Sequence, residues 1–203
     1  MAHTRRPELH LHTPLHVTLR AVERAPNLRA ERVFAIIDAE IRAAVRRGHR
    51  IVHFSVQHNH VHLVIEVDED VGLGRRMQRL VSRIAQLINA MTGRRGALWR
   101  DRYHRRDITS PRQMRRTLVY VLFNERKHSP YELVREESFR LDPCSSTLWF
   151  TEWNERAPPP KDYVARVRAR HGPSPLMPAR TWLLRTGYKQ SGRLRFGEVP
   201  KIS

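Results

Sequence analysis

The feature that most constrains the fold is the order in which strand-like and helix-like patterns of apolar residues follow one another along the chain. Short strand-like apolar runs and longer stretches with helical spacing follow one another as strand, helix, strand, strand, helix, strand. They cover residues 15–20, 33–45, 51–56, 60–67, 73–91 and 98–108. This order predicts an α+β fold of ferredoxin-like type, an antiparallel sheet sandwich with helices on one face.

The capping residues at the start of a further helix predict a seventh element. Ser110 can cap this helix, Pro111 suits its first turn, and Gln113 stands three residues after the cap. We expect the helix to run to about Lys127, because Ser129-Pro130 follows as a stop signal.

This helix separates apolar from polar side chains. Leu118 marks the centre of its apolar face. The side almost opposite carries Tyr120, Arg116, Asn124 and Lys127. Tyr120 and Asn124 stand at i and i+4, so the phenol and the amide project side by side next to two cations. Such a group suits phosphate chemistry. An ordinary half-exposed tyrosine is the alternative, and the pattern alone favours it.

Two histidines share one face of a predicted strand. Because side chains alternate along a strand, His60 and His62 point to one side while Val61 and Leu63 point to the other. The two imidazoles stand about 7 Å apart along the strand and can bind one divalent metal ion. The alternative is a pair of surface histidines in a chain that has 12 of them.

The charge of the chain predicts its partner. There are 38 Lys and Arg against 20 Asp and Glu, a net charge of +18, and only four of the cations are Lys. Arginine binds phosphate through a planar fork, so the composition indicates nucleic acid. One cysteine, Cys144, excludes an internal disulfide framework. No apolar run reaches membrane-spanning length and no signal-peptide region follows Met1, so we expect a cytoplasmic, nucleoid-associated protein with no membrane partner.

The composition of the chain changes beyond residue 130. Turn and linker segments such as 142–146 and 157–160 appear here, together with most of the prolines. Trp149, Trp153 and Trp182 indicate that the region still packs against something. We expect a domain over residues 1–130 and a basic, Pro-rich C-terminal extension over residues 131–203.

Several segments together resemble the HUH superfamily of single-strand endonucleases. His60-Val61-His62 is similar to its histidine–hydrophobe–histidine signature, and residues 120–124 resemble the nucleophile helix of its single-tyrosine transposase branch. Residues 16–20 and 98–103 resemble the first and last strands of the family, in the same order. The likeness spans roughly residues 14–130 and is strongest to the REP-associated tyrosine transposases.

The resemblance implies an activity and a set of residues. Tyr120 matches the nucleophile, and His60, His62 and Asn124 match ligands of a divalent metal, Mg²⁺ or Mn²⁺. The implied reaction nicks and rejoins single-stranded DNA, beside hairpins, through a covalent phosphotyrosine. Residues 57–59 and 124–126 depart from the motifs that the family usually has there, but neither departure changes a ligand position.

DNA contacts are expected from basic residues on the predicted helices and the last strand. They are Arg75, Arg79, Arg83, Arg100, Arg102, Arg105, Arg106, Arg116 and Lys127. We also expect His58 to contact DNA and Trp99 to pack in the core. Tyr103 is the rival nucleophile, although it has no amide partner at i+4.

Other functions compete with an active transposase. The main alternative is a domesticated, catalytically silent protein that binds DNA hairpins. An RNA-binding module is a third possibility, but its usual aromatic motifs are absent from the sequence. The sequence does not distinguish a monomer from a homodimer.

Overall fold

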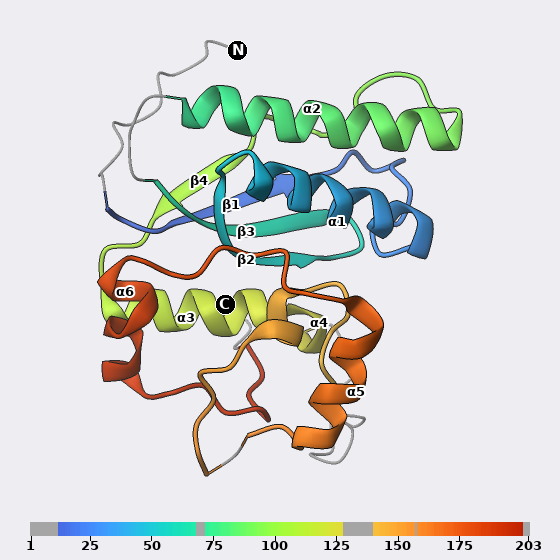
Figure 1. Cartoon of the computed structure of the whole chain (residues 1–203). Helices are drawn as coiled ribbons and strands as arrows, with labels where there is room; N and C mark the ends of the chain where they lie inside the picture. Colours follow the sequence, from blue (N-terminus) through green and yellow to red (C-terminus); the bar gives the residue numbers. More distant parts are fainter. Residues whose placement is uncertain (1–11, 68–71, 128–139, 157, 201–203) are drawn as a thin grey trace.

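A four-stranded antiparallel sheet forms the centre of the protein, which we describe from a computed structural model covering residues 12–67, 72–127, 140–156 and 158–200. The strand order is β2-β3-β1-β4. The strands are β1 (Leu15–Arg20), β2 (Arg50–Val56), β3 (His60–Glu66) and β4 (His104–Asp107). Helices α1 (Glu31–Arg46) and α2 (Leu73–Thr92) cover one face of the sheet, and α3 (Pro111–Leu122) lies across the other (Figure 1). The α+β ferredoxin-like prediction is confirmed.

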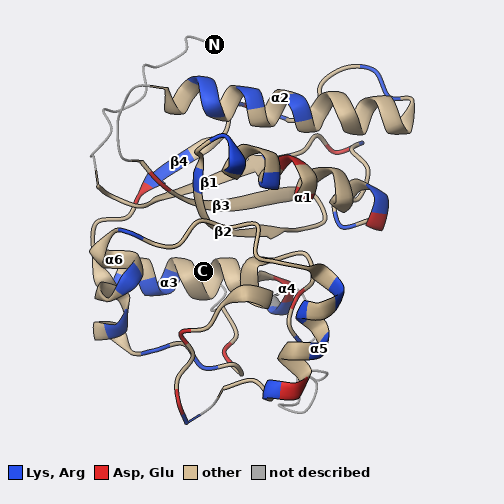
Figure 2. Ribbon diagram, in the orientation of Figure 1, with Lys and Arg blue, Asp and Glu red and all other residues tan. Residues whose placement is uncertain are grey.

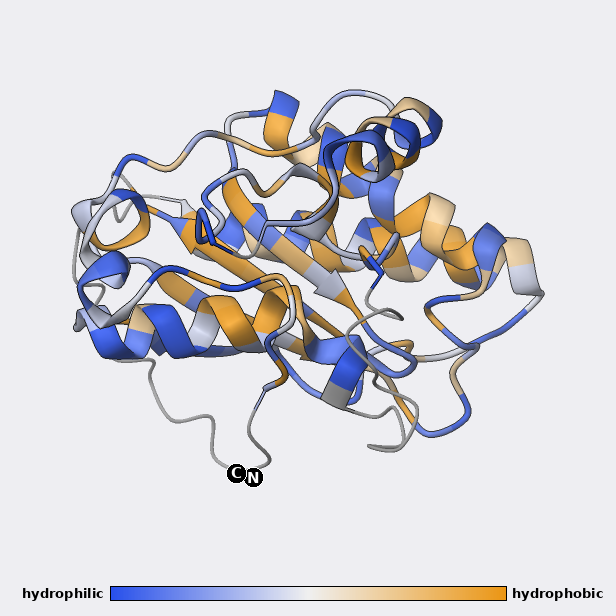
Figure 3. Ribbon diagram, turned by 90° about the horizontal axis from the view of Figure 1, so that it is seen from below, coloured by the Kyte–Doolittle hydropathy of each residue, from blue (hydrophilic) through white to orange (hydrophobic). Residues whose placement is uncertain are grey.

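Alternation along the strands gives the two faces of the sheet different characters. On β1, Val17 and Leu19 are buried against α1 and α2. His16 and Thr18 point to the α3 side, and the register places Thr18 directly opposite His62 of β3. The strands are coloured mostly orange in Figure 3, as expected for a sheet covered on both faces.

The predicted strand over residues 98–108 is wrong in its first half. Only His104–Asp107 pairs as a strand with β1, and residue 99 makes an isolated bridge to Ala21. The loop between them is pinned at its start, because the Arg100 amide donates to the Arg20 carbonyl and Trp99 is buried, as expected. The indole Nε1 of Trp99 donates to the Val81 carbonyl.

The predicted helix over residues 111–127 is divided in two. Its start is as expected: the Ser110 side chain accepts a hydrogen bond from the Gln113 amide. Phe123, with φ −118°, interrupts it, and a short helix α4 (Asn124–Lys127) follows. The Phe123 ring packs against Trp153 with centroids 5.9 Å apart, a contact with the C-terminal region that no local sequence signal indicates. The expected stop signal at residues 129–130 lies outside the described residues.

The described part of residues 140–200 packs beneath α3 (Figure 1) and completes a second hydrophobic cluster. Leu118 and Leu122 of α3 are buried there together with Leu148, Trp153 and Tyr188. The elements of this region are the 3-10 helices η3 (Ser146–Trp149) and η4 (Gly187–Ser191) and the helices α5 (Lys161–His171) and α6 (Trp182–Arg185). Among the described helices, none has the length and apolar character to cross a membrane.

Glu66, the last residue of β3, anchors the C-terminal region to the sheet. Its buried carboxylate accepts hydrogen bonds from the Arg50 guanidinium at 2.7 Å, the Thr181 amide at 2.7 Å, the Thr181 hydroxyl at 2.8 Å and the Arg180 amide at 2.9 Å. Burial opposes ionisation of this carboxyl. The hydrogen bonds from Thr181, Arg50 and Arg180 outweigh that cost and lower the pKa of Glu66.

Candidate active site

The two histidines at the start of β3 lie side by side on the face covered by α3. The ring centroids of His60 and His62 are 4.7 Å apart and the rings are nearly perpendicular. The Nδ1 of His60 lies 2.8 Å from the side-chain oxygen of Asn59, so Nδ1 donates its proton there. That bond leaves the lone pair of His60 on Nε2, the nitrogen available to a metal ion.

His62 is held from β1 by Thr18 and His16, which the sequence patterns do not identify as site residues. Its Nδ1 lies 3.1 Å from both Thr18 Oγ1 and His16 Nε2, and only 3% of the residue is exposed. These contacts occupy Nδ1 and direct metal binding to Nε2, as in many metal-bound histidines. Alternation along β1 places His16 and Thr18 on the same face of the strand. The sequence does not give the register between β1 and β3, which brings that face to His62.

His16 is uncharged near neutral pH. Burial, with smaller contributions from His104 and Arg106, lowers its pKa to about 4. A neutral imidazole beside His62 avoids placing a second positive charge next to a group that would bind a cation.

Tyr120 of α3 points at these histidines. The centroid of its ring lies 5.0 Å from that of His62 and 6.1 Å from that of His16, both in edge-to-face geometry. The residue is half-buried. Tyr120, expected on the polar side of α3, therefore contacts the sheet, while Leu118 lies in a cluster formed by the C-terminal region together with Val52 and Val64 of the sheet.

Asn124 is buried, in contrast to its expected place on a polar face. Only 1% of the residue is exposed, and neither Oδ1 nor Nδ2 has a hydrogen-bond partner within the described structure. An amide left in this state costs about 1–3 kcal/mol, so such groups are rare unless something else binds them. A metal ion would satisfy the oxygen.

The donor set fits a divalent metal ion. Two imidazole nitrogens and one amide oxygen suit Mn²⁺ on ligand softness and leave positions for phosphate oxygens and water. The described residues contain no group of three or more His, Cys, Asp or Glu that could hold a metal ion. Asn124, whose amide has no hydrogen-bond partner within the described structure, stays the predicted third ligand.

Two of the arginines expected to bind DNA lie around this cluster. Arg106 of β4 stands directly opposite His16 and His104 stands opposite Thr18, so both share the face of the cluster, and both are exposed. Arg116, exposed on α3, lies one helical turn before Tyr120. Both arginines therefore lie next to the residues of the cluster.

The structure does not bring the other expected DNA contacts to the cluster. The α2 arginines are exposed, but α2 lies across the sheet from α3 (Figure 2). Arg105 points to the α1 and α2 side, where 8% of its side chain is exposed and it pairs with Asp107 at 3.3 Å. Five of the expected DNA contacts are exposed but have no link to the cluster within the described residues: Arg75, Arg79, Arg83, Arg100 and Arg102. The side chain of Lys127 lies outside the described structure. Their contacts with DNA remain predictions.

The rival nucleophile lies elsewhere. Tyr103 is half-buried and packs against the cluster of side chains between the sheet and α1 and α2. His58, in the connector between β2 and β3, is exposed and remains a candidate DNA contact.

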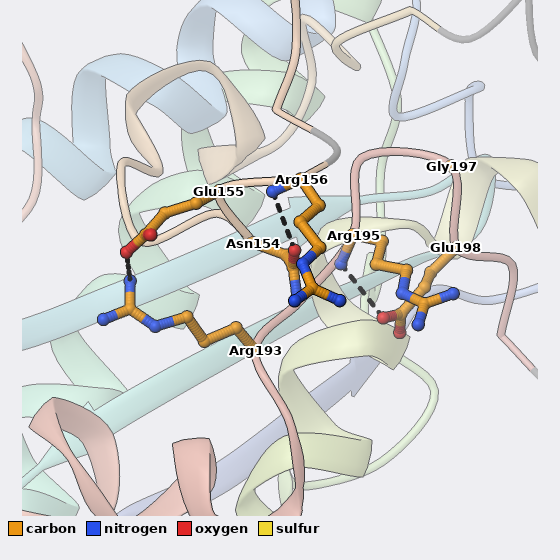
Figure 4. A pocket seen from close by; sticks show the side chains of 7 residues that line it. All are labelled: Asn154, Glu155, Arg156, Arg193, Arg195, Gly197 and Glu198. Atoms are coloured by element: carbon orange, nitrogen blue, oxygen red, sulfur yellow. Dashed lines mark hydrogen bonds and ion pairs between the residues drawn. The ribbon is translucent and has the colours of Figure 1, made fainter.

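A cavity of about 720 Å³ is lined by residues of the C-terminal region (Figure 4). Three arginines line it: Arg156, Arg193 and Arg195. Glu155 pairs with Arg193 at 3.8 Å, and the carboxylate of Glu198 accepts a hydrogen bond from the Arg195 amide. None of the expected site residues lines this cavity, so we do not assign the chemistry to it.

Comparisons with known proteins identify a similar fold and a family. A solved structure described as the REP-associated tyrosine transposase bound to a REP hairpin has a TM-score of 0.54 and 18% sequence identity, covering 72% of this chain and 82% of that one. A comparison with curated proteins finds no match. The family model described as "Transposase IS200 like" matches residues 11–121, more than half of the chain and the part that contains His60, His62 and Tyr120. The chain belongs to the IS200-like transposase family.

Proposed function

We propose that this protein nicks and rejoins single-stranded DNA through a covalent link to Tyr120. The observation that carries the proposal is the contact between the Tyr120 ring and His62, with His60 beside it on the same sheet face. A helix and a strand far apart in sequence thereby place a nucleophile next to two potential metal ligands.

His60, His62 and Asn124 would hold the divalent ion, Mg²⁺ or Mn²⁺. When bound, the ion supplies positive charge that neutralises the developing charge on the scissile phosphate. Asn59 fixes the ring of His60, while Thr18 and His16 fix that of His62, so both imidazoles are oriented before an ion binds.

The chemical step belongs to Tyr120. Its Oη attacks the phosphorus of a phosphodiester, an O–P bond to tyrosine forms, and the bond from phosphorus to the 3′ oxygen breaks. The phenolic proton passes to solvent and the leaving oxygen takes up a proton to become a 3′-hydroxyl. Attack by a second 3′-hydroxyl reverses these steps, so strands are rejoined without an external energy source.

The substrate is DNA with an unpaired segment beside a hairpin. A net charge of +18 and the exposed Arg106 and Arg116 near Tyr120 support a polyanionic strand crossing the cluster. The structurally similar transposase is bound to a REP hairpin, which supports the same kind of substrate here.

The C-terminal extension, residues 131–203, supports the nucleophile helix of the domain at 1–130. The residues described from 140 onward bury the apolar side of α3 and so hold Tyr120 towards the sheet. The predicted boundary at residue 130 lies outside the described residues.

The competing function is a catalytically silent hairpin-binding protein. The buried, unsatisfied amide of Asn124 favours the enzyme, because a pure binder gains nothing from that cost.

A strand-transfer assay distinguishes the active transposase from the silent hairpin-binding protein. We expect the protein with Mn²⁺ to cut a labelled hairpin with a single-stranded tail and join the label to a second oligonucleotide. EDTA, His60→Ala and His62→Ala should each abolish both reactions while leaving binding in EDTA unchanged. Binding without any cutting by the wild type would select the silent binder.

A further inference from the structure

One large apolar side chain stands out on the surface of the C-terminal region. Trp182, the first residue of α6, is 54% exposed and is the one large hydrophobic residue exposed within the described ranges. A single exposed apolar residue is ordinary by itself. The way this one is held, and the charges around it, are what point to a ligand.

The indole packs closely against the backbone at Gly187. Its six-membered ring lies so close to Gly187 that a Cβ at that position would come within 2.8 Å of the ring. The Trp182 carbonyl accepts a hydrogen bond from the Thr186 amide at 2.8 Å. The preceding residue, Thr181, is tied by its amide and hydroxyl to the Glu66 carboxylate. A ring fixed in this way loses little entropy when a partner stacks on it.

The segment around Trp182 is strongly basic. Residues 179–197 contain five Lys and Arg and no acidic residue; Lys189 and Arg193 pair with Glu152 and Glu155, and the other three cations are Arg180, Arg185 and Arg195. Arg180 and Arg185 are exposed on either side of the tryptophan, and α6 carries blue in Figure 2. An exposed aromatic ring with arginines two residues before and three residues after it is a combination that suits single-stranded nucleic acid, with stacking for a base and positive charge for its phosphates.

Trp182 is also within reach of the candidate active site. Glu66, which holds Thr181, shares the strand face of His62 and lies four residues further along β3. Four residues of strand span about 13 Å, roughly the rise of four stacked nucleotides. The segment that begins with Trp182 therefore lies about four nucleotides from the His62 cluster when measured along β3.

We propose that Trp182 is a stacking platform for an unpaired base in the single-stranded segment of the DNA substrate. The proposal rests on the proposed function, because it takes DNA as the ligand. It assigns the arginines beside Trp182 to the phosphates that flank the stacked base.

The test is a binding titration in the Tyr120→Phe background, where no cutting occurs. Fluorescence anisotropy would compare a hairpin carrying a single-stranded oligothymidine tail with the same hairpin without a tail. Trp182→Ala should raise the Kd for the tailed hairpin roughly 5- to 150-fold and change that for the blunt hairpin less than about twofold. Trp182→Phe should retain part of the affinity, because it keeps a smaller ring.

Two further variants distinguish stacking from charge and from misfolding. Gly187→Ala keeps Trp182 and every cation but displaces the ring, so it should reproduce the loss for the tailed hairpin. Arg185→Ala should weaken both hairpins and reduce the log–log salt slope by about 0.7, whereas Trp182→Ala should leave that slope unchanged. Melting temperatures of all variants near that of the parent confirm folding.

Each other outcome overturns the inference. Binding of the tailed hairpin within about twofold of the parent by Trp182→Ala refutes stacking, and a loss of mass in light scattering would then assign Trp182 to a contact between copies. Equal losses for both hairpins would assign Trp182 to the duplex. No DNA binding by the parent would refute the proposed function as well.

Discussion

Replacing Asn124 with leucine should stabilise the protein and at the same time remove its response to metal. Both polar atoms of this buried amide lack a partner within the described structure, at a cost of about 1–3 kcal/mol. Leucine has a similar volume and no such cost. For a chain of this length about 2 kcal/mol corresponds to roughly 4–8 °C, so Asn124→Leu in EDTA should melt higher than the wild type by about that amount.

Thermal denaturation with and without Mn²⁺ measures both halves of this prediction. At 100 times its Kd, a ligand of the folded state stabilises by about 2.7 kcal/mol, so the wild type should gain several degrees while Asn124→Leu gains little. Asn124→Asp is the matched control, because its buried charge should destabilise the protein in EDTA and Mn²⁺ should reverse the effect. If Asn124→Leu melts below the wild type in EDTA, the amide has a structural role and the reasoning is refuted.

Three other consequences can be measured. Glu66→Ala should cost about 3–5 kcal/mol in urea unfolding, because it removes the buried carboxylate that Arg50 binds; a cost below about 1 kcal/mol would contradict the anchor. The pKa of Glu66 is lowered in the folded protein, so its contribution to the free energy of unfolding is complete above about pH 4.5 and is lost as the pH falls through the folded pKa. Acid should therefore destabilise the wild type more than Glu66→Gln. Arg106→Ala should slow nicking more than Arg79→Ala, because Arg79 lies on α2, across the sheet from Tyr120. Equal effects of the two substitutions in a nicking assay would contradict the assignment of Arg106 as a DNA contact.

Local periodicity was sufficient to predict most of the fold. Strand alternation at residues 15–20 and 60–66 matches β1 and β3, and the Ser110 cap marks the start of α3. The errors arise where tertiary contacts override the pattern. Phe123 leaves the helix to pack against Trp153, thirty residues further along the chain, and Trp99 is buried before β4 begins.

The candidate site was predictable in its residues but not in its arrangement. His60, His62 and Tyr120 have recognisable motifs, and the structure places their rings in contact. His16 escaped notice because its role depends on the register between β1 and β3, a non-local property. The burial of Asn124 depends equally on the break at Phe123 and could not be read from helical spacing.

The most direct test of the account is the identity of the residue that becomes linked to DNA. Labelled single-stranded or tailed hairpin DNA would be incubated with the protein and Mn²⁺, separated under denaturing conditions, and the adduct mapped by proteolysis and mass spectrometry. The account predicts a DNA-linked peptide containing Tyr120, and no adduct from Tyr120→Phe or in EDTA. An adduct that persists in Tyr120→Phe and maps to Tyr103, or the absence of any adduct from the wild type while DNA is cut, would contradict it.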